Sequence, residues 1–239
     1  MRFSIDIGGE LELKLYQAML LYRNDHRNRH MATVHNVAQK DGEGFPSLGA
    51  GQLLASAGLR ELTKLLGTGC PVEFLPDQVL ARTPDLLAWW TPAARRPMFF
   101  RKESELGDVS GKAFPHPALL FVVCHGTLHV RALPASRRPS ADTKLAAAPY
   151  WNVDDRGAVC AGTMRAPKSL IVASMAAWQH AFFQSEFTHP GGAGRATKRR
   201  GGTKALWMGL VGKKRFPQSA LIEVEPLEEY LRRLEDAHR

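Results

Sequence analysis

Two apolar segments separated by two residues constrain the fold of this chain more than any other part of it. Residues 118–124 contain no charged side chain, His125 and Gly126 follow, and 127–133 form a second segment. A short apolar run bounded by a turn signal predicts a buried strand, and a two-residue connection predicts a hairpin. Because strands joined by a hairpin run antiparallel, the sequence predicts an antiparallel sheet without helical crossovers.

Three segments show helical periodicity, and their order among the strands predicts an α+β fold. Pro167 stands where a helix can begin, and apolar residues recur at helical spacing from 170 to 185. Residues 49–66 show the same spacing before a glycine, and 226–236 are an amphipathic segment that starts at a proline. The order of strands, loop and helix favours α+β, because hairpins replace the crossovers of an α/β protein.

The N-terminal part of the chain predicts several strands ahead of its helix. Residues 3–15 alternate apolar and polar side chains around Gly8 and Gly9, which indicates a hairpin with one buried face. Residues 18–22 and 33–38 predict two further strands, and a polar connection separates them. We therefore expect a strand-and-helix region at the start of the chain.

The domain organisation follows from one polar stretch and one basic stretch. Residues 103–112 are polar and contain two glycines, so they are the best candidate for an internal boundary. Residues after Pro190 are rich in glycine and in Lys and Arg. We expect an N-terminal region over 1–105, a core over 106–190, and a basic Gly-rich loop with a C-terminal helix over 191–239.

Composition limits the class of protein. Of the 239 residues 44% are hydrophobic, which is enough for a buried core, yet no apolar run approaches the length of a membrane span. The N-terminus lacks the apolar block of a signal peptide, so we expect a cytoplasmic protein. Three cysteines without CxxC spacing argue against a disulfide framework and a thiolate zinc site. We expect no metal and no cofactor.

A polar loop near the middle of the chain contains the best candidate for a reactive residue. Asn152, Gly157 and Cys160 stand at fixed offsets in the segment YWNVDDRGAVC. A thiol nucleophile needs a turn that exposes it and a polar group that meets an oxyanion, and this segment offers both. Cys124, by contrast, ends an apolar strand and is expected to be a buried side chain, and nothing near Cys70 indicates activation.

The spacing from the Asn to the Cys resembles the active-site segment of ubiquitin-conjugating enzymes, in which a His-Pro-Asn motif precedes the cysteine. More narrowly, the chain resembles the PRTRC system protein B family, a plasmid- and mobile-element-associated bacterial family of prokaryotic ubiquitin-conjugating-like proteins. The segments that carry the resemblance are LYRND, VLARTPDLLAWWTPAARRPMFF, HPALLFVV, APYWNVDDRGAVCAG and WQHAFFQSEFTH. The resemblance implies a ubiquitin-conjugating-enzyme-like antiparallel β-meander with flanking helices, and we expect the N-terminal strand-and-helix region to pack against it.

The resemblance also implies an activity. A ThiF-like activating enzyme would pass the C-terminal carbonyl of a ubiquitin-like protein to Cys160 as a thioester, and an amine would then attack it. Asn152 would steady the loop or bind the oxyanion, although an Asx turn is an equal alternative. The chain departs from the motif because Tyr150 and Trp151 replace His-Pro. We expect Asp154 and Asp155 to be turn carboxylates, and orientation of an incoming amine is their alternative role. We expect His189 to cap the preceding helix, and an approach to the cysteine site is its alternative.

Two alternative functions remain open at this stage. Net charge is +9, and Lys198, Arg199 and Arg200 belong to a basic stretch over 195–215 that is suited to phosphate contacts with nucleic acid. Trp207 and Phe216 interleave with these charges and are candidates for base stacking. The other alternative is a catalytically silent scaffold with the same fold.

Overall fold

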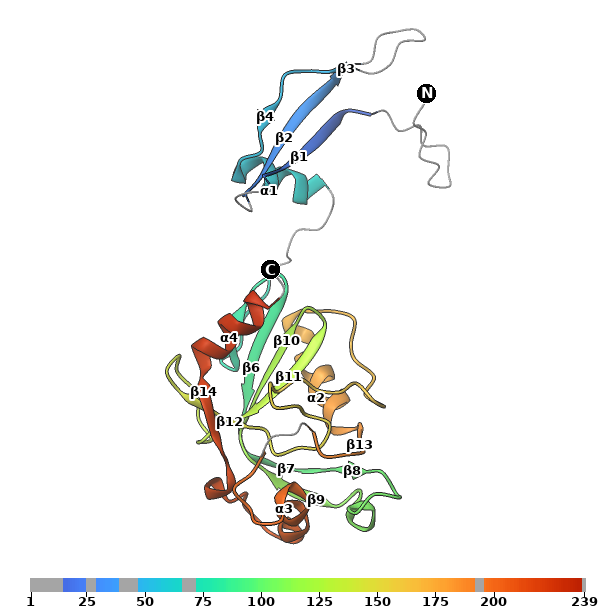
Figure 1. Ribbon diagram of the computed structural model, residues 1–239, viewed down its shortest axis with the longest axis vertical. Helices are drawn as coiled ribbons and strands as arrows, with labels where there is room; N and C mark the ends of the chain where they lie inside the picture. Colours follow the sequence, from blue (N-terminus) through green and yellow to red (C-terminus); the bar gives the residue numbers. More distant parts are fainter. Residues whose placement is uncertain (1–14, 25–28, 39–46, 66–71, 192–195, 238–239) are drawn as a thin grey trace. The chain divides into compact units, whose positions relative to one another are not determined.

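The computed structural model describes residues 15–24, 29–38, 47–65, 72–191 and 196–237. The chain forms two compact units, 1–71 and 72–239 (Figure 1). The sequence placed an internal boundary at 105/106, whereas the two units divide at 71/72. The reason is that strands between 79 and 100 pair with strands that follow residue 113.

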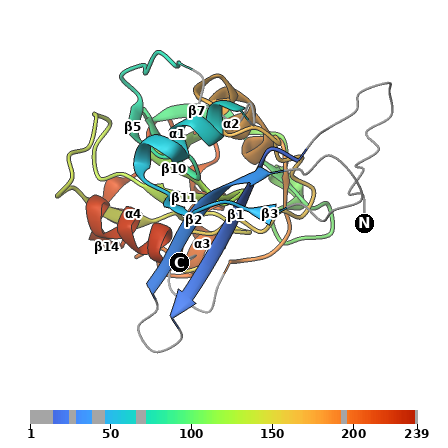
Figure 2. The same cartoon turned by 90° about the horizontal axis from the view of Figure 1, so that it is seen from above.

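The described residues of the first unit form a long strand pair, two short strands and one helix. β1 (Gln17–Asn24) pairs antiparallel with β2 (Arg29–Ala38), and Figure 2 shows these strands side by side. The short strands β3 (Ser47–Leu48) and β4 (Gln52–Leu53) both pair with β2. The two predicted strands are confirmed, and the hairpin predicted over 3–15 lies outside the described residues.

The helix of the first unit is shorter than the sequence predicted. α1 covers Ser56–Leu65, whereas helical spacing of leucines suggested a helix over 49–66. The start is later because Leu53 pairs with Thr33 of β2, and the Leu54 amide donates to the carbonyl of Ala32. Residues at helical spacing thus join the sheet when a strand edge supplies their backbone partners.

The second unit is built on a six-stranded antiparallel sheet in the order β14-β12-β11-β10-β6-β5. The strands are β5 (Val79–Arg82), β6 (Leu86–Thr91), β10 (Leu119–Cys124), β11 (Thr127–Ala132), β12 (Lys144–Ala147) and β14 (Glu223–Pro226). The hairpin predicted from the apolar run is β10–β11. The α+β fold with an antiparallel meander is therefore confirmed.

The central strand β10 is buried on both faces, and each face packs against a different helix. Phe121 points to a core that contains Phe182 of α2 (Met175–Phe183), and their ring centroids lie 5.8 Å apart. Val122 and Cys124 point to a second core with Leu234 of α4 (Leu227–Asp236). This double burial explains why the run reads as continuously apolar and not as an alternating strand.

Short strand pairs complete the second unit. β7 (Ala94–Pro97) pairs with β9 (Ala113–His116), and β8 (Phe99–Phe100) runs parallel to β13 (Glu186–Phe187). The 3-10 turn η1 (Gly107–Val109) lies between β8 and β9 and follows the fully buried Leu106. The stretch predicted as an internal boundary is thus a connection inside the second unit.

Helix α2 begins later than the sequence predicted. It starts at Met175, after the turn η2 (Val172–Ser174), and not at Pro167. The delay arises because the Val172 amide donates to Glu73 at 2.6 Å and the Trp178 indole donates to the Ser169 carbonyl at 3.3 Å. The backbone groups of Ser169 and Val172 thus have partners outside the hydrogen-bond pattern of an α-helix.

The region predicted as a basic Gly-rich loop contains a helix. α3 covers Gly202–Leu210 and buries Leu206, Trp207 and Leu210, and the turn η3 (Gln218–Ala220) follows. Glycines and cations dominate the composition here, so the helical spacing of these three apolar residues was not recognised in the sequence. The predicted C-terminal helix is α4, which begins one residue after Pro226.

Candidate functional site

The loop that carries Cys160 extends the sheet beside β11. The Val130 amide donates to the Gly157 carbonyl and the Val159 amide donates to the Leu128 carbonyl, both at 2.8 Å. On β11, strand β12 pairs only with the last two residues, Arg131 and Ala132. The loop therefore pairs with the earlier part of β11, where His129 faces Ala158. Val159 is buried, whereas the next side chain, Cys160, is exposed. The backbone partners therefore fix the loop and leave the thiol at the surface.

Gly157 allows this loop to approach the sheet closely. Its φ is +87°, in the left-handed region that disfavours side chains. A Cβ at this position would lie 2.7 Å from the Tyr230 hydroxyl, 3.0 Å from the Val130 carbonyl oxygen and 3.1 Å from Nε of Arg131. Both the backbone angle and the space thus require glycine.

Asn152 anchors the other end of the loop, and its side chain is buried at 4% exposure. Nδ2 donates to the Glu186 carbonyl at 2.8 Å, and Oδ1 accepts from the backbone amide and hydroxyl of Thr188 at 3.1 and 3.0 Å. Its carbonyl accepts the Cys160 amide at 2.8 Å. With its oxygen and one amide hydrogen occupied, Asn152 joins the Cys160 segment to the chain after α2. Its backbone φ of +58° is one that Asn tolerates better than most residues.

The turn between these anchors is held by Asp154 and by contacts to α4. The Asp154 carboxylate accepts the amides of Arg156 at 2.9 Å and Ala158 at 2.8 Å, which makes it the turn carboxylate that the sequence suggested. The Tyr230 hydroxyl donates to the Arg156 carbonyl at 3.1 Å. The buried Arg131 donates to the Asp155 carbonyl at 2.9 Å. Helix α4 and strand β11 therefore grip the turn from one side.

His189 does not cap the preceding helix, so this prediction was wrong. α2 ends at Phe183, and strand β13 lies between this helix and His189. The His189 carbonyl accepts the Asn152 amide at 3.0 Å, and its ring shares a 2.8 Å hydrogen bond with the Thr188 hydroxyl. The exposed His189 side chain thus stands on the segment that Asn152 anchors.

Tyr150 and Trp151, which replace the His-Pro of the related motif, fix the start of the loop in the core. Nε2 of His116 lies 3.1 Å from the Arg96 carbonyl and must donate to it, so Nδ1 accepts the Tyr150 hydroxyl at 2.8 Å. Burial lowers the pKa of His116 to about 4, which agrees with the neutral ring. The Trp151 indole donates to Thr203 of α3 at 3.0 Å.

The other cysteines lack these features. Cys124 is buried under α4, and its thiol points to the Leu234 carbonyl at 3.6 Å. Burial raises the pKa of Cys124, and the carboxylates of Asp85 and Glu235 raise it further. It is the small buried side chain that the sequence predicted. Cys70 lies outside the described residues.

Two negative findings concern the described residues. No group of three or more His, Cys, Asp or Glu side chains in the described part of the chain is arranged to hold a metal ion. No helix among the described residues has the length and apolar character needed to cross a membrane.

The antiparallel sheet, the helix on each of its faces and the anchored cysteine loop define a ubiquitin-conjugating-enzyme-like protein. The chain belongs to the prokaryotic E2 family D, whose family model matches residues 59–224. The match covers strands β5 to β12 of the sheet, the loop with Asn152 and Cys160, and α3, but it ends within β14 and before α4. No curated protein and no solved structure matches the chain.

Proposed function

We propose that Cys160 accepts a ubiquitin-like protein as a thioester from a ThiF-like activating enzyme, in the cytoplasm and within a plasmid-associated PRTRC system. The observation that carries the proposal is the exposed thiol at the end of a loop whose backbone is anchored on both sides. Membership in a prokaryotic E2 family supports the same chemistry.

The transfer needs one nucleophile and no redox partner. The Cys160 thiolate attacks the carbonyl carbon of the modifier's thioester on the activating enzyme, and the tetrahedral intermediate expels that enzyme's cysteine as a thiolate. An amine of the acceptor then attacks the new thioester, forms an amide and releases Cys160. Each step exchanges one acyl bond for another, with a proton lost from the attacking group.

Asn152 serves this reaction as a positioning residue. Its side chain fixes the segment from Glu186 to His189 beside the cysteine, and its carbonyl fixes the Cys160 amide. Only the second amide hydrogen of Nδ2 remains for an oxyanion. We therefore assign the loop-steadying role to Asn152, which holds the thiol where a partner's thioester can reach it.

A charging experiment tests the proposal. The protein is incubated with ATP, the ThiF-like activating enzyme and the ubiquitin-like protein encoded beside it, and the products are separated on a non-reducing gel. We expect a thiol-sensitive adduct that Cys160→Ala abolishes and that Cys160→Ser converts to a thiol-resistant oxyester. Cys124→Ser is the matched control and should leave the adduct unchanged.

The opposite result would favour the two alternative functions predicted from the sequence. If the activating enzyme is itself charged and no adduct forms on the wild-type protein, the chain is a scaffold with a conjugating-enzyme fold or a nucleic-acid-binding protein. An adduct that persists in Cys160→Ala would place the acceptor at another residue.

A further inference from the structure

Helix α3 brings two basic segments together that lie apart in the sequence. Lys198 and Arg199 precede the helix, whereas Lys213 and Arg215 follow it. All four line one groove of about 490 Å³. The remaining lining residues belong to α3 and to the segment around η3, and they are Leu206, Gly209, Leu210, Pro217, Ser219 and Ala220. Four cations therefore converge on one concave surface.

The walls of this α3 groove are fixed by hydrogen bonds. Thr197, at 1% exposure, donates its hydroxyl to the Ala220 carbonyl at 2.8 Å and accepts the Arg199 amide at 3.2 Å. The Lys198 amide donates to the same carbonyl at 2.8 Å, and Arg95 donates to the Lys213 carbonyl at 2.8 Å. The backbone that presents the charges is thus held in place before any ligand arrives.

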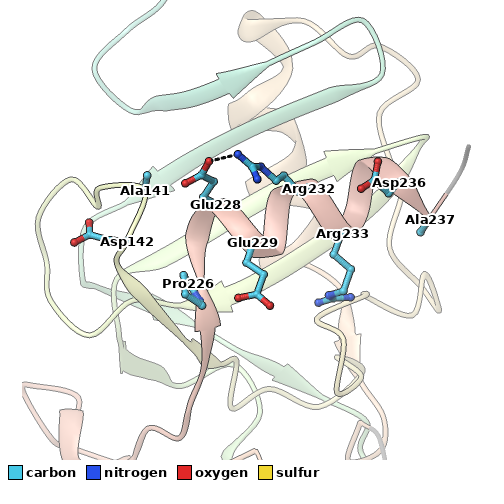
Figure 3. A pocket seen from close by; sticks show the side chains of 9 residues that line it. All are labelled: Ala141, Asp142, Pro226, Glu228, Glu229, Arg232, Arg233, Asp236 and Ala237. Carbon is cyan, nitrogen blue, oxygen red and sulfur yellow. Dashed lines mark hydrogen bonds and ion pairs between the residues drawn. The ribbon is translucent and has the colours of Figure 1, made fainter.

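The charges of the α3 groove differ from those of the groove along α4. In the groove along α4, Arg232 pairs with Glu228 at 2.5 Å, as Figure 3 shows, and Arg233 pairs with Glu225 at 2.7 Å. Among the described residues, no acidic side chain lines the α3 groove and its four cations form no ion pair. Four like charges gathered without counter-charges indicate a site for an anionic ligand.

The burial of the aromatic residues beside the α3 groove limits the kind of anion that it can bind. Trp207 is fully buried and its indole donates to the Pro149 carbonyl at 2.7 Å, while Phe216 is 8% exposed. Neither side chain presents a face for stacking, so the base-stacking role predicted from the sequence is wrong. Leu206 and Leu210 are also buried, which leaves little apolar surface for the side chains of an acidic peptide.

We propose that the α3 groove binds the phosphate backbone of a nucleic-acid duplex, without reading its sequence. Lys198, Arg199, Lys213 and Arg215 supply charge for phosphate contacts, and the buried aromatics exclude the stacking that single-stranded binding uses. This activity does not depend on Cys160 and goes beyond the proposed thioester relay. Duplex DNA and duplex RNA share the chemistry that this site recognises.

The test measures the salt dependence of binding to a fluorescent 30-base-pair DNA of random sequence by anisotropy. Four phosphate contacts predict a slope of log affinity against log salt of about −3.6. The double variant Lys213→Ala, Arg215→Ala should reduce the slope to about −1.8 and weaken binding about 50-fold at 0.1 M salt. The matched control removes two exposed cations outside the groove, Lys112→Ala with Arg137→Ala, and should change neither value.

Further arms separate the remaining explanations. The charge-retaining variant Arg199→Lys, Arg215→Lys should bind within about threefold of wild type, and an RNA duplex should bind like DNA, because backbone charge is the feature recognised. Cys160→Ala should bind the duplex normally, which distinguishes this site from the relay. An unchanged slope in the alanine double variant, with unaltered thermal unfolding, would overturn the proposal. Tighter binding of single strands, or displacement of the duplex by poly-glutamate at equal charge, would also overturn it.

Discussion

Cys124 and Cys160 lie beside the same strand pair, yet their surroundings give the two thiols opposite properties. Cys124 is the last residue of β10 and packs into the core beneath α4, where burial raises its pKa. Cys160 follows a loop that hydrogen-bonds to β11 and ends at the surface. The difference teaches that the exposure of a thiol here depends on whether its residue lies inside the sheet or in the loop at the sheet edge, since the scaffold is common to both.

The largest expected effect is a difference in alkylation rate. Iodoacetamide should modify native Cys160 at least about 10³-fold faster than Cys124, because Cys124 becomes accessible only when α4 opens from the sheet. Peptide-resolved mass spectrometry over a time course measures both rates in one sample. In concentrated urea the two rates should converge, and equal rates in the native protein would refute the comparison.

Gly157→Ala should disrupt the Cys160 loop and leave the Cys124 side folded. The left-handed φ and the contacts with Tyr230 and Val130 together predict a loss of about 3 kcal/mol in the free energy of unfolding. Gly126→Ala is the matched control, because its φ is +77° and nothing lies within 4 Å of the added Cβ. Urea unfolding compares the two variants, and equal losses would mean that close packing at Gly157 contributes nothing.

Acid should weaken the aromatic core under the Cys160 loop. The pKa of His116 is lowered from 6.5 to about 4, so the unfolded state binds the proton more readily and stability falls as pH falls through this window. The loss should be about 2 kcal/mol between pH 7 and pH 5. His116→Gln should remove about this much of the pH dependence, measured by urea unfolding at both pH values. An identical pH slope in the variant would contradict the buried neutral ring.

The smallest expected effect concerns the link between α4 and the loop. Tyr230→Phe removes the hydroxyl that donates to the Arg156 carbonyl and should cost about 1 kcal/mol. The alkylation rate of Cys124 should stay unchanged, whereas that of Cys160 should change with the position of the loop. Thermal unfolding measures the loss of stability, and the alkylation assay measures the two rates. A change of rate at Cys124 alone would contradict the link between Tyr230 and the Cys160 loop.

The sequence predicted those features that depend on local pattern. The β10–β11 hairpin, the strands β1 and β2 and the helix α4 follow from apolar runs, a turn signal and a proline. Each of these signals lies within the element that it predicts or directly beside it. The α+β class followed from the hairpin together with the order of strands, loop and helices along the chain.

The rest depended on partners far away along the chain. The start of α2 is delayed by Glu73, about 100 residues earlier, and no local signal reveals that contact. The role of Asn152 rests on carbonyl and amide groups of residues 186–188, so the sequence left an Asx turn as an equal alternative. Helix α3 was missed because glycines and cations hid the spacing of Leu206, Trp207 and Leu210.

The contacts of β14 and α4 with the Cys160 loop and its neighbour Arg131 form late during synthesis of the chain. Glu225, which pairs with Arg131, and Tyr230 are encoded 65 and 70 residues after the cysteine. At synthesis rates of roughly 5–20 residues per second, they emerge about 3–14 s after it. Throughout that interval the thiol stands on a loop that nothing holds from the α4 side. In a growing chain, the loop and Arg131 therefore acquire their contacts with Tyr230 and Glu225 only after strands β5 to β12 have been made.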